Sequence, residues 1–127
     1  NILFSGDTLF NAGCGRMFEG DPKMFWESLL KIKSLPLDTK IYCGHEYTLS
    51  NIKFALSIDP DNQNLKKLAD WANQQEDEHR PTIPTTLKDQ TLCNPFLRCD
   101  SEYFYSYYDS KDPEEIFAKM RSAKDNF

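Results

Sequence analysis

The sequence predicts an α/β protein in which short strands and one helix precede a mostly helical region. Two observations support this prediction. The apolar run Ile2–Phe4 and the run Lys40–Cys43 are typical of short strands, and a helical pattern lies between them. After Thr48, helical signals follow one another without a further strong strand. We therefore expect a βαβ-like unit over residues 1–47 and a mostly helical unit over residues 48–127.

Composition limits the classes of partner. The chain has 127 residues, 39% of them apolar, and a formal net charge of -5, which argues against a nucleic-acid partner. No apolar stretch approaches the roughly 18 residues that a membrane span requires. The four cysteines show no CxxC spacing, so free thiols in a reducing compartment, the cytoplasm, are expected.

The first helix is predicted from its cap and its apolar spacing. Asp21 is a helix-capping residue, and Pro22 suits the first helical turn. The apolar positions Phe25 and Leu29 fall on one face of a helix. We expect this helix to end at about Ser34, before Pro36.

The second unit is predicted to consist of helices joined by one extended loop. Thr48 can cap a helix through about Ser57, and Asp59-Pro60 can start another that ends near Glu76. The prolines of "RPTIPTTL" favour an extended loop. Asp112-Pro113 then predicts a final helix to about Lys124.

Both predicted strands end in a glycine followed by a ligand-type side chain. Gly6 precedes Asp7, and Gly44 precedes His45. In α/β proteins, functional groups gather at the carboxyl ends of strands, and glycine allows a sharp turn there. The spacing alone is equally compatible with an Asp7 that bonds to the turn backbone and a partly buried structural histidine.

Longer motifs distinguish these alternatives. The strings "GDTLFNAGCGRMFEG", "YCGHEYTLSNIKFA", "NPFLR" and "MRSAKDNF" occur in this order. Together they resemble the second half of glyoxalase II, the hydroxyacylglutathione hydrolase of the metallo-β-lactamase superfamily, over nearly the whole chain. The resemblance implies the second-half remnant of an αββα sandwich followed by a helical glutathione-binding domain.

The resemblance also implies a reaction and a metal centre. Members of the family hydrolyse S-D-lactoylglutathione to D-lactate and glutathione with two divalent metals, zinc or iron. Asp7 then corresponds to the carboxylate that bridges the metals, and His45 to a ligand of the second metal. The residue types suit this chemistry, because a carboxylate can span two cations and a neutral imidazole binds zinc or iron.

The family's motif Thr-His-x-His-x-Asp-His does not occur in this sequence. We therefore expect a piece of a longer parent enzyme that is inactive alone and does not retain both metals. We also expect exposed apolar faces behind Ile2, Phe4 and Ile41, and hence self-association.

The resemblance assigns a second set of residues to the substrate. The predicted glutathione contacts are Arg16, Phe18, His45, Tyr47, Arg121 and Lys124. Basic side chains suit the carboxylates of glutathione, and Phe18 lacks the hydroxyl that some relatives have at its position. Composition alone also allows Arg121 and Lys124 to form an ordinary solvated edge.

Two other functions remain open. A related persulfide dioxygenase uses one iron in the same superfamily fold, although it lacks the helical extension that carries Arg121 and Lys124. A noncatalytic glutathione-binding or interaction module is the other alternative. Cys14 and Cys43 are interpreted as small packing residues, because no activating base is evident beside them.

Overall fold

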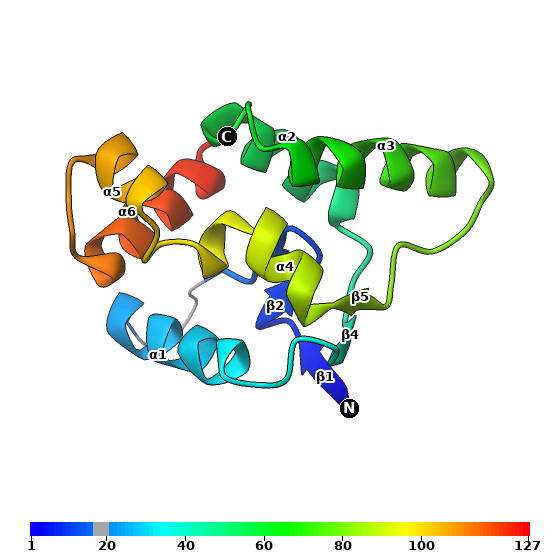
Figure 1. The fold of residues 1–127 in the computed structure, drawn as a ribbon, viewed down its shortest axis with the longest axis horizontal. Coiled ribbons are helices and arrows are strands. Elements are labelled where there is room, and N and C mark those ends of the chain that lie inside the picture. Colours follow the sequence, from blue (N-terminus) through cyan, green and yellow to red (C-terminus); the bar gives the residue numbers. More distant parts are fainter. Residues whose placement is uncertain (17–20) are drawn as a thin grey trace.

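A mixed α/β arrangement is present in the computed structural model, which describes residues 1–16 and 21–127. The elements are β1 (Ile2–Gly6), β2 (Leu9–Phe10), β3 (Gly13–Cys14), α1 (Pro22–Lys33), β4 (Lys40–Cys43), α2 (Thr48–Ile58), α3 (Gln63–Asp77), β5 (Thr85–Thr86), α4 (Leu87–Cys93), the 3-10 helix η1 (Pro95–Leu97), α5 (Glu102–Tyr108) and α6 (Pro113–Asp125). In Figure 1, α2 and α3 lie along one side of the molecule, α1 lies along the opposite side, and α4 lies between them. Within the described residues, no helix is long and apolar enough to cross a membrane.

The βαβ-like unit is confirmed. Strands β1 and β4 pair in parallel, with Ile2 opposite Lys40 and Phe4 opposite Tyr42, and α1 lies between them in the chain. The register shifts between Phe4 and Gly6. A short antiparallel pair, β2 with β3, follows β1 directly. Because β1 and β4 run in the same direction, the residues that follow them emerge at the same edge of the sheet.

Helix α1 begins where the sequence predicts. The Asp21 side chain accepts a hydrogen bond from the Met24 N–H at 2.9 Å, and Pro22 occupies the first turn. Helix α6 is capped in the same way, since Asp112 accepts from the Glu114 N–H at 3.0 Å. Both predicted helices are therefore confirmed.

Two predicted helix starts are wrong, and in each case the expected capping group is used elsewhere. Tyr47, not Thr48, is the N-cap residue of α2, because the Thr48 hydroxyl bonds to Thr82. Helix α3 is capped by Asn62 and begins at Gln63. The carboxylate of Asp59, the expected cap, instead pairs with Arg98.

The predicted extended loop contains a strand that the sequence analysis did not anticipate. Strand β5 has only two residues, which is too short for a periodic signal, and it pairs antiparallel with β4 through Thr85 and Ile41. The sheet order is therefore β1-β4-β5. Helices α4 and α5, each of seven residues, were also too short to be predicted from periodicity.

The main core lies where α1, η1 and α6 meet. Phe117 of α6 stacks on Phe25 of α1 at 5.3 Å between ring centroids and contacts Phe96 of η1 at 5.9 Å. Phe96 also stacks near Phe54 of α2. The C-terminus is held beside α2, where Phe127 contacts the same Phe54 ring (Figure 1). Aromatic packing thus joins the first helix, the last helix and α2.

Strand β1, at the edge of the sheet, is not fully buried. Ile2 is 61% exposed and Phe4 is 79% exposed, which confirms the expected apolar exposure at these two positions. The same expectation is wrong for Ile41, which is 1% exposed because β4 is the central strand and its side chain faces the core.

A buried amide network joins the β2–β3 hairpin to α4. Asn94 is fully buried, and its Nδ2 donates to the Gly13 carbonyl at 2.9 Å and to the Phe10 carbonyl at 3.2 Å. Its Oδ1 accepts from the Phe96 N–H. Gln90, also fully buried, accepts from the Ala12 N–H at 2.9 Å. These bonds satisfy hairpin groups that would otherwise be buried without partners.

Replacing Asn94 with Ala should therefore lower the free energy of unfolding by about 3 kcal/mol, because buried carbonyls lose their donor. Urea unfolding measures this difference. The control is Asn73→Ala, whose exposed side chain donates to the Ala69 carbonyl in the preceding helical turn and whose loss should cost less than about 0.5 kcal/mol. Equal unfolding midpoints for the two variants would contradict a stabilising role of the Asn94 hydrogen bonds to the hairpin.

Candidate functional site

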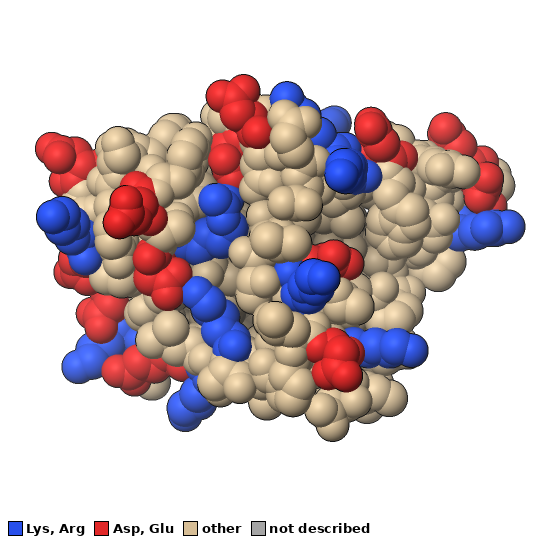
Figure 2. All heavy atoms as spheres, viewed as in Figure 1, with Lys and Arg blue, Asp and Glu red and all other residues tan. Residues whose placement is uncertain are grey.

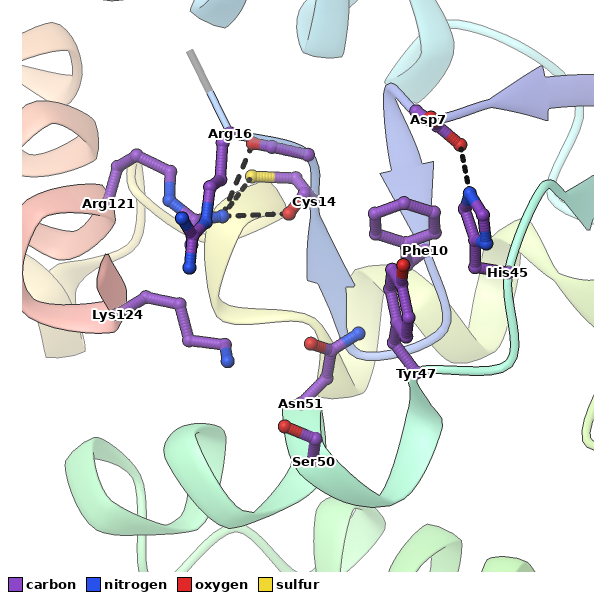
Figure 3. A pocket seen from close by; sticks show the side chains of 11 residues that line it. Asp7, Phe10, Cys14, Arg16, His45, Tyr47, Ser50, Asn51, Arg121 and Lys124 are labelled. Atoms are coloured by element: carbon purple, nitrogen blue, oxygen red, sulfur yellow. Dashed lines mark hydrogen bonds and ion pairs between the residues drawn. The ribbon is translucent and has the colours of Figure 1, made fainter. Parts of the chain in front are cut away.

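Asp7 and His45 meet at the edge where β1 and β4 end. The Gly44 N–H donates to the Gly6 carbonyl at 2.8 Å, which continues the pairing past the strands. His45 Nε2 then lies 3.3 Å from Asp7 Oδ1 (Figure 3). Both side chains are substantially exposed. The ends of the two parallel strands thus bring Asp7 and His45 together.

Glycine is required on both sides of this contact. Gly6 has a φ of 53°, a left-handed conformation that disfavours side chains. A Cβ on Gly44 would lie 2.7 Å from Asp7 Oδ1. The two glycines that the sequence places beside Asp7 and His45 thus allow the turn at one strand end and the close approach at the other.

Three aromatic rings form one wall of the site. The His45 ring stacks on Tyr47, with 4.8 Å between centroids and 8° between planes. Tyr47 in turn meets the edge of Phe10 at 5.1 Å. Figure 3 shows this group on the opposite side of the site from Arg16 and Lys124.

The opposite wall is cationic. Arg16 follows β3, whereas Arg121 and Lys124 lie one helical turn apart on α6 (Figure 3). Burial, together with the neighbouring Arg121 and Arg16 charges, lowers the pKa of Lys124. Asp125 partly offsets these charges, because its Oδ1 lies 2.8 Å from Arg121 Nη2 and 3.8 Å from Arg16 Nε. A bound anion would relieve the remaining repulsion.

Arg121 uses most of its N–H donors in hydrogen bonds within the protein. It is 3% exposed, and its Nη1 donates to the Cys14 carbonyl at 2.7 Å and to the Gly15 carbonyl at 3.2 Å. Nε and Nη2 both donate to Asp125. The guanidinium has five N–H donors, and one on Nη2 has no acceptor among residues 1–16 and 21–127. The alternative of a solvated edge is wrong for Arg121, because the side chain is buried.

These walls enclose a pocket of about 460 Å³, within the range of small-molecule sites. Its lining consists of Asp7, Phe10, Cys14, Gly15, Arg16, His45, Tyr47, Ser50, Asn51, Arg121 and Lys124. On the face shown in Figure 2, basic and acidic side chains are interspersed. In the pocket, by contrast, the three basic side chains Arg16, Arg121 and Lys124 lie together.

Most of the predicted site residues converge on this pocket. Phe18 lies outside the described residues. Sequence reasoning missed Phe10 and Asn51, which also line the pocket. Asn51 follows Tyr47 by four positions at the start of α2, so their helical spacing could have indicated a shared face. Phe10 carried no such signal, because its position depends on the β2–β3 turn.

The residues at the strand ends suit a metal, but they are few. Adjacent ligands of a tetrahedral zinc ion, each about 2.1 Å from it, lie about 3.4 Å apart. The 3.3 Å between Asp7 Oδ1 and His45 Nε2 fits that separation. Within residues 1–16 and 21–127, no group of three His, Cys, Asp or Glu side chains is arranged to hold an ion. Asp7 and His45 can thus supply part of a metal centre.

The cysteines are free thiols, as expected. Cys14 lines the pocket, but burial raises its pKa to about 12 despite the nearby Arg121 charge. Burial likewise raises the pKa of Cys93 to about 11 and raises that of Cys43. Thiols with raised pKa values are poor nucleophiles, which supports their interpretation as packing residues.

The protein has an α/β fold, and its pocket lies between the ends of the parallel strands and a wall of basic side chains. The family description "Hydroxyacylglutathione hydrolase C-terminus" matches residues 46–127, more than half of the chain. The chain therefore belongs to the hydroxyacylglutathione hydrolase family, and its resemblance to glyoxalase II is confirmed.

Individual relatives agree with this assignment. The hydroxyacylglutathione hydrolase of Erythrobacter litoralis is 46% identical over 126 residues, covering 99% of this chain and 50% of the relative. That of Rhodospirillum rubrum is 49% identical over 129 residues, covering 100% and 50%. A hydroxyacylglutathione hydrolase-like protein of Gallus gallus is 45% identical over 126 residues, covering 98% and 45%. The chain spans about half the length of the curated relatives it matches.

At pH 8, Cys43 should react with Ellman's reagent first, because it is the least buried of the four thiols. Cys14, Cys93 and Cys99 should react at least about tenfold more slowly, since the buried thiols ionise little. Cys43→Ser should remove the rapid phase, and unfolding in guanidinium should expose all four. A rapid reaction at Cys14 would contradict its interpretation as a packing residue.

Proposed function

We propose that this chain is the substrate-binding part and a partial metal-binding part of a thiolesterase that hydrolyses S-D-lactoylglutathione to D-lactate and glutathione. The observation that supports the proposal most strongly is a single pocket with Asp7 and His45 at one end and a cationic wall at the other. The family membership agrees with it.

The pocket matches the charges of glutathione. Arg16 and Lys124 can pair with its carboxylates, and Arg121 can add one N–H while it holds the Cys14 and Gly15 carbonyls. Tyr47 can place its ring or hydroxyl against the peptide part of the ligand. Because the cationic wall faces Asp7 and His45 across the pocket, a glutathione bound there would direct its thioester toward those two residues.

Asp7 and His45 would hold the metals. When bound, two divalent ions, zinc or iron, supply an activated water and stabilise the charge that develops on the thioester oxygen. Asp7 contributes a carboxylate that can bridge two cations, and His45 an imidazole whose ring is oriented by Tyr47. The remaining ligands would come from a segment that corresponds to the other half of the relatives. We therefore expect this chain alone to be inactive and not to retain both metals.

The domain boundary near Thr48 and the solution state are also proposals. Residues 1–47 would belong to the metallo-β-lactamase-like domain, and residues 48–127 to the helical glutathione-binding domain. The apolar side chains of Ile2 and Phe4 on the outer strand support self-association of the isolated chain. Free cysteines agree with the cytoplasm as its location.

A noncatalytic glutathione-binding module is the second candidate. It is favoured because the described residues supply a complete wall of basic side chains, but only two side chains, Asp7 and His45, that are placed to bind a metal. Binding of glutathione without thioester hydrolysis by the whole protein would distinguish this module from the enzyme. Oxygen uptake with a persulfide of glutathione would instead indicate the iron dioxygenase.

In the whole protein that contains this chain, Arg16→Ala combined with Lys124→Ala should raise KM for S-D-lactoylglutathione about tenfold, with little change in kcat. Each partly exposed charge contact contributes about 1 kcal/mol to binding at most, equally in the ground and transition states. Steady-state kinetics measure both constants. Lys119→Ala, an exposed lysine on the same helix that pairs with Glu115, serves as the control.

Asp7→Asn should behave differently. Loss of the carboxylate charge should lower kcat at least about a hundredfold or reduce the metal content, because metal affinity depends on the ligand charge. Steady-state kinetics and elemental analysis of the purified variant measure these effects. Full activity with unchanged metal content would show that Asp7 is not a metal ligand.

A further inference from the structure

Glu46 lies between the two site residues His45 and Tyr47, but its own carboxylate binds elsewhere. Oε1 accepts a hydrogen bond from the Thr82 backbone N–H at 2.8 Å, and Oε2 accepts from the Thr82 hydroxyl at 2.7 Å. The two bonds use both carboxylate oxygens. A carboxylate held at two points by one residue has little freedom to rotate.

Thr82 is in turn held by two further parts of the site. It is 4% exposed and lies in the connection from α3 to β5, which returns to the sheet beside β4 (Figure 1). Because its hydroxyl hydrogen is used on Glu46, its oxygen accepts from the Thr48 hydroxyl at 2.5 Å. Its carbonyl accepts from Asn11 Nδ2 at 3.0 Å.

These contacts connect both loops that form the aromatic wall. Asn11 follows Phe10 in the β2–β3 turn, and it also accepts from the buried Gln90 at 2.8 Å. Glu46 and Thr48 flank Tyr47 in the chain. Thr82 therefore bonds to the segments that carry Phe10 and Tyr47, whose rings meet at 5.1 Å.

The His45 ring depends on this arrangement. Its stacking partner Tyr47 is the N-cap residue of α2, and Glu46 lies between His45 and Tyr47 in the chain. If Glu46 were released, the turn from Gly44 to Tyr47 would lose its two bonds to Thr82 while keeping the pairing of Gly44 with Gly6. The freedom gained would fall on His45 and Tyr47.

We infer that Glu46 and Thr82 form a clamp that positions His45 and Tyr47 in the pocket, with Glu46 a positioning residue that does not itself contact the substrate. The effect of the clamp on the His45–Tyr47 stack does not depend on the proposed activity. The effect on turnover rests on the proposed thioester hydrolysis. The two parts can therefore be tested separately.

The first test uses this chain without any ligand. In NMR spectra, the His45 ring protons of the wild-type chain should show a shift caused by the stacked Tyr47 ring, and Glu46→Ala should abolish that shift. Glu46 is exposed, so its removal should leave the fold intact. Glu76→Ala, an exposed glutamate that lines the same surface hollow as Glu46 and Thr82, is the control and should leave the His45 signals unchanged.

A second pair of variants examines the other end of the clamp. Thr82→Val keeps the side-chain shape and the backbone N–H but removes the hydroxyl, so it should weaken the stack. Thr82→Ser restores the hydroxyl and should restore the wild-type spectrum. Thr91→Val is the matched control, because its hydroxyl bonds locally to the Lys88 carbonyl. If Thr82→Val does not fold, Glu46→Ala and Thr82→Ser decide the question.

The second test uses the whole protein with S-D-lactoylglutathione. Glu46→Ala should raise KM about tenfold and lower kcat about tenfold or more, because Tyr47 and His45 both lose their alignment. A purely structural role would reduce the amount of folded enzyme and leave KM unchanged. Thr82→Ser should stay within about threefold of the wild type in kcat/KM.

The outcomes separate the two claims. An unchanged His45–Tyr47 stack in Glu46→Ala would overturn the clamp. A lost stack with an unchanged KM in an active enzyme would overturn the role of the clamp in substrate binding. A lost stack in a whole protein that does not hydrolyse the thioester would support the clamp and overturn the proposed hydrolysis.

Discussion

The parallel pairing of β1 with β4 is the constraint on which the candidate site depends. Parallel strands deliver their carboxyl ends to one edge of a sheet, and the Gly44 to Gly6 hydrogen bond extends this pairing by one further step. Asp7 and His45 are 38 positions apart in the sequence but 3.3 Å apart in space for this reason. An antiparallel arrangement of the same strands would have placed them at opposite edges.

Buried polar side chains attach the helical part of the chain to that edge. Arg121 holds the Cys14 and Gly15 carbonyls, and Asn94 holds the Phe10 and Gly13 carbonyls. A buried group of this kind is costly to leave unpaired, so each bond selects one relative placement of helix and hairpin. The shape of the pocket follows from these bonds as well as from apolar packing.

The site combines restrained and accessible groups. Arg121 is buried and used mainly for support, whereas Arg16, Lys124, Asp7 and His45 keep solvent-accessible atoms. This division is suited to binding, because the supporting groups set the positions of the groups that can exchange water for a ligand. Arg121 and Lys124 are neighbouring cations on one helix, but Arg121 mainly supports the backbone around the pocket, whereas Lys124 is accessible to a ligand.

The sequence by itself determined the elements with strong local signals and the residues with ligand chemistry. The Asp21 and Asp112 caps defined α1 and α6, since a cap involves residues only two or three apart. The glycines before Asp7 and His45 indicated the strand-end site, and the family motifs indicated its chemistry. Tertiary structure decided what depends on distant partners. It withdrew Asp59 and Thr48 from capping, added the two-residue strand β5, buried Ile41 and Arg121, and brought Thr82 to Glu46. Local sequence cannot reveal these outcomes, because each depends on residues that are distant in the chain. For Thr48 and Asp59, a tertiary polar contact replaces the local capping bond.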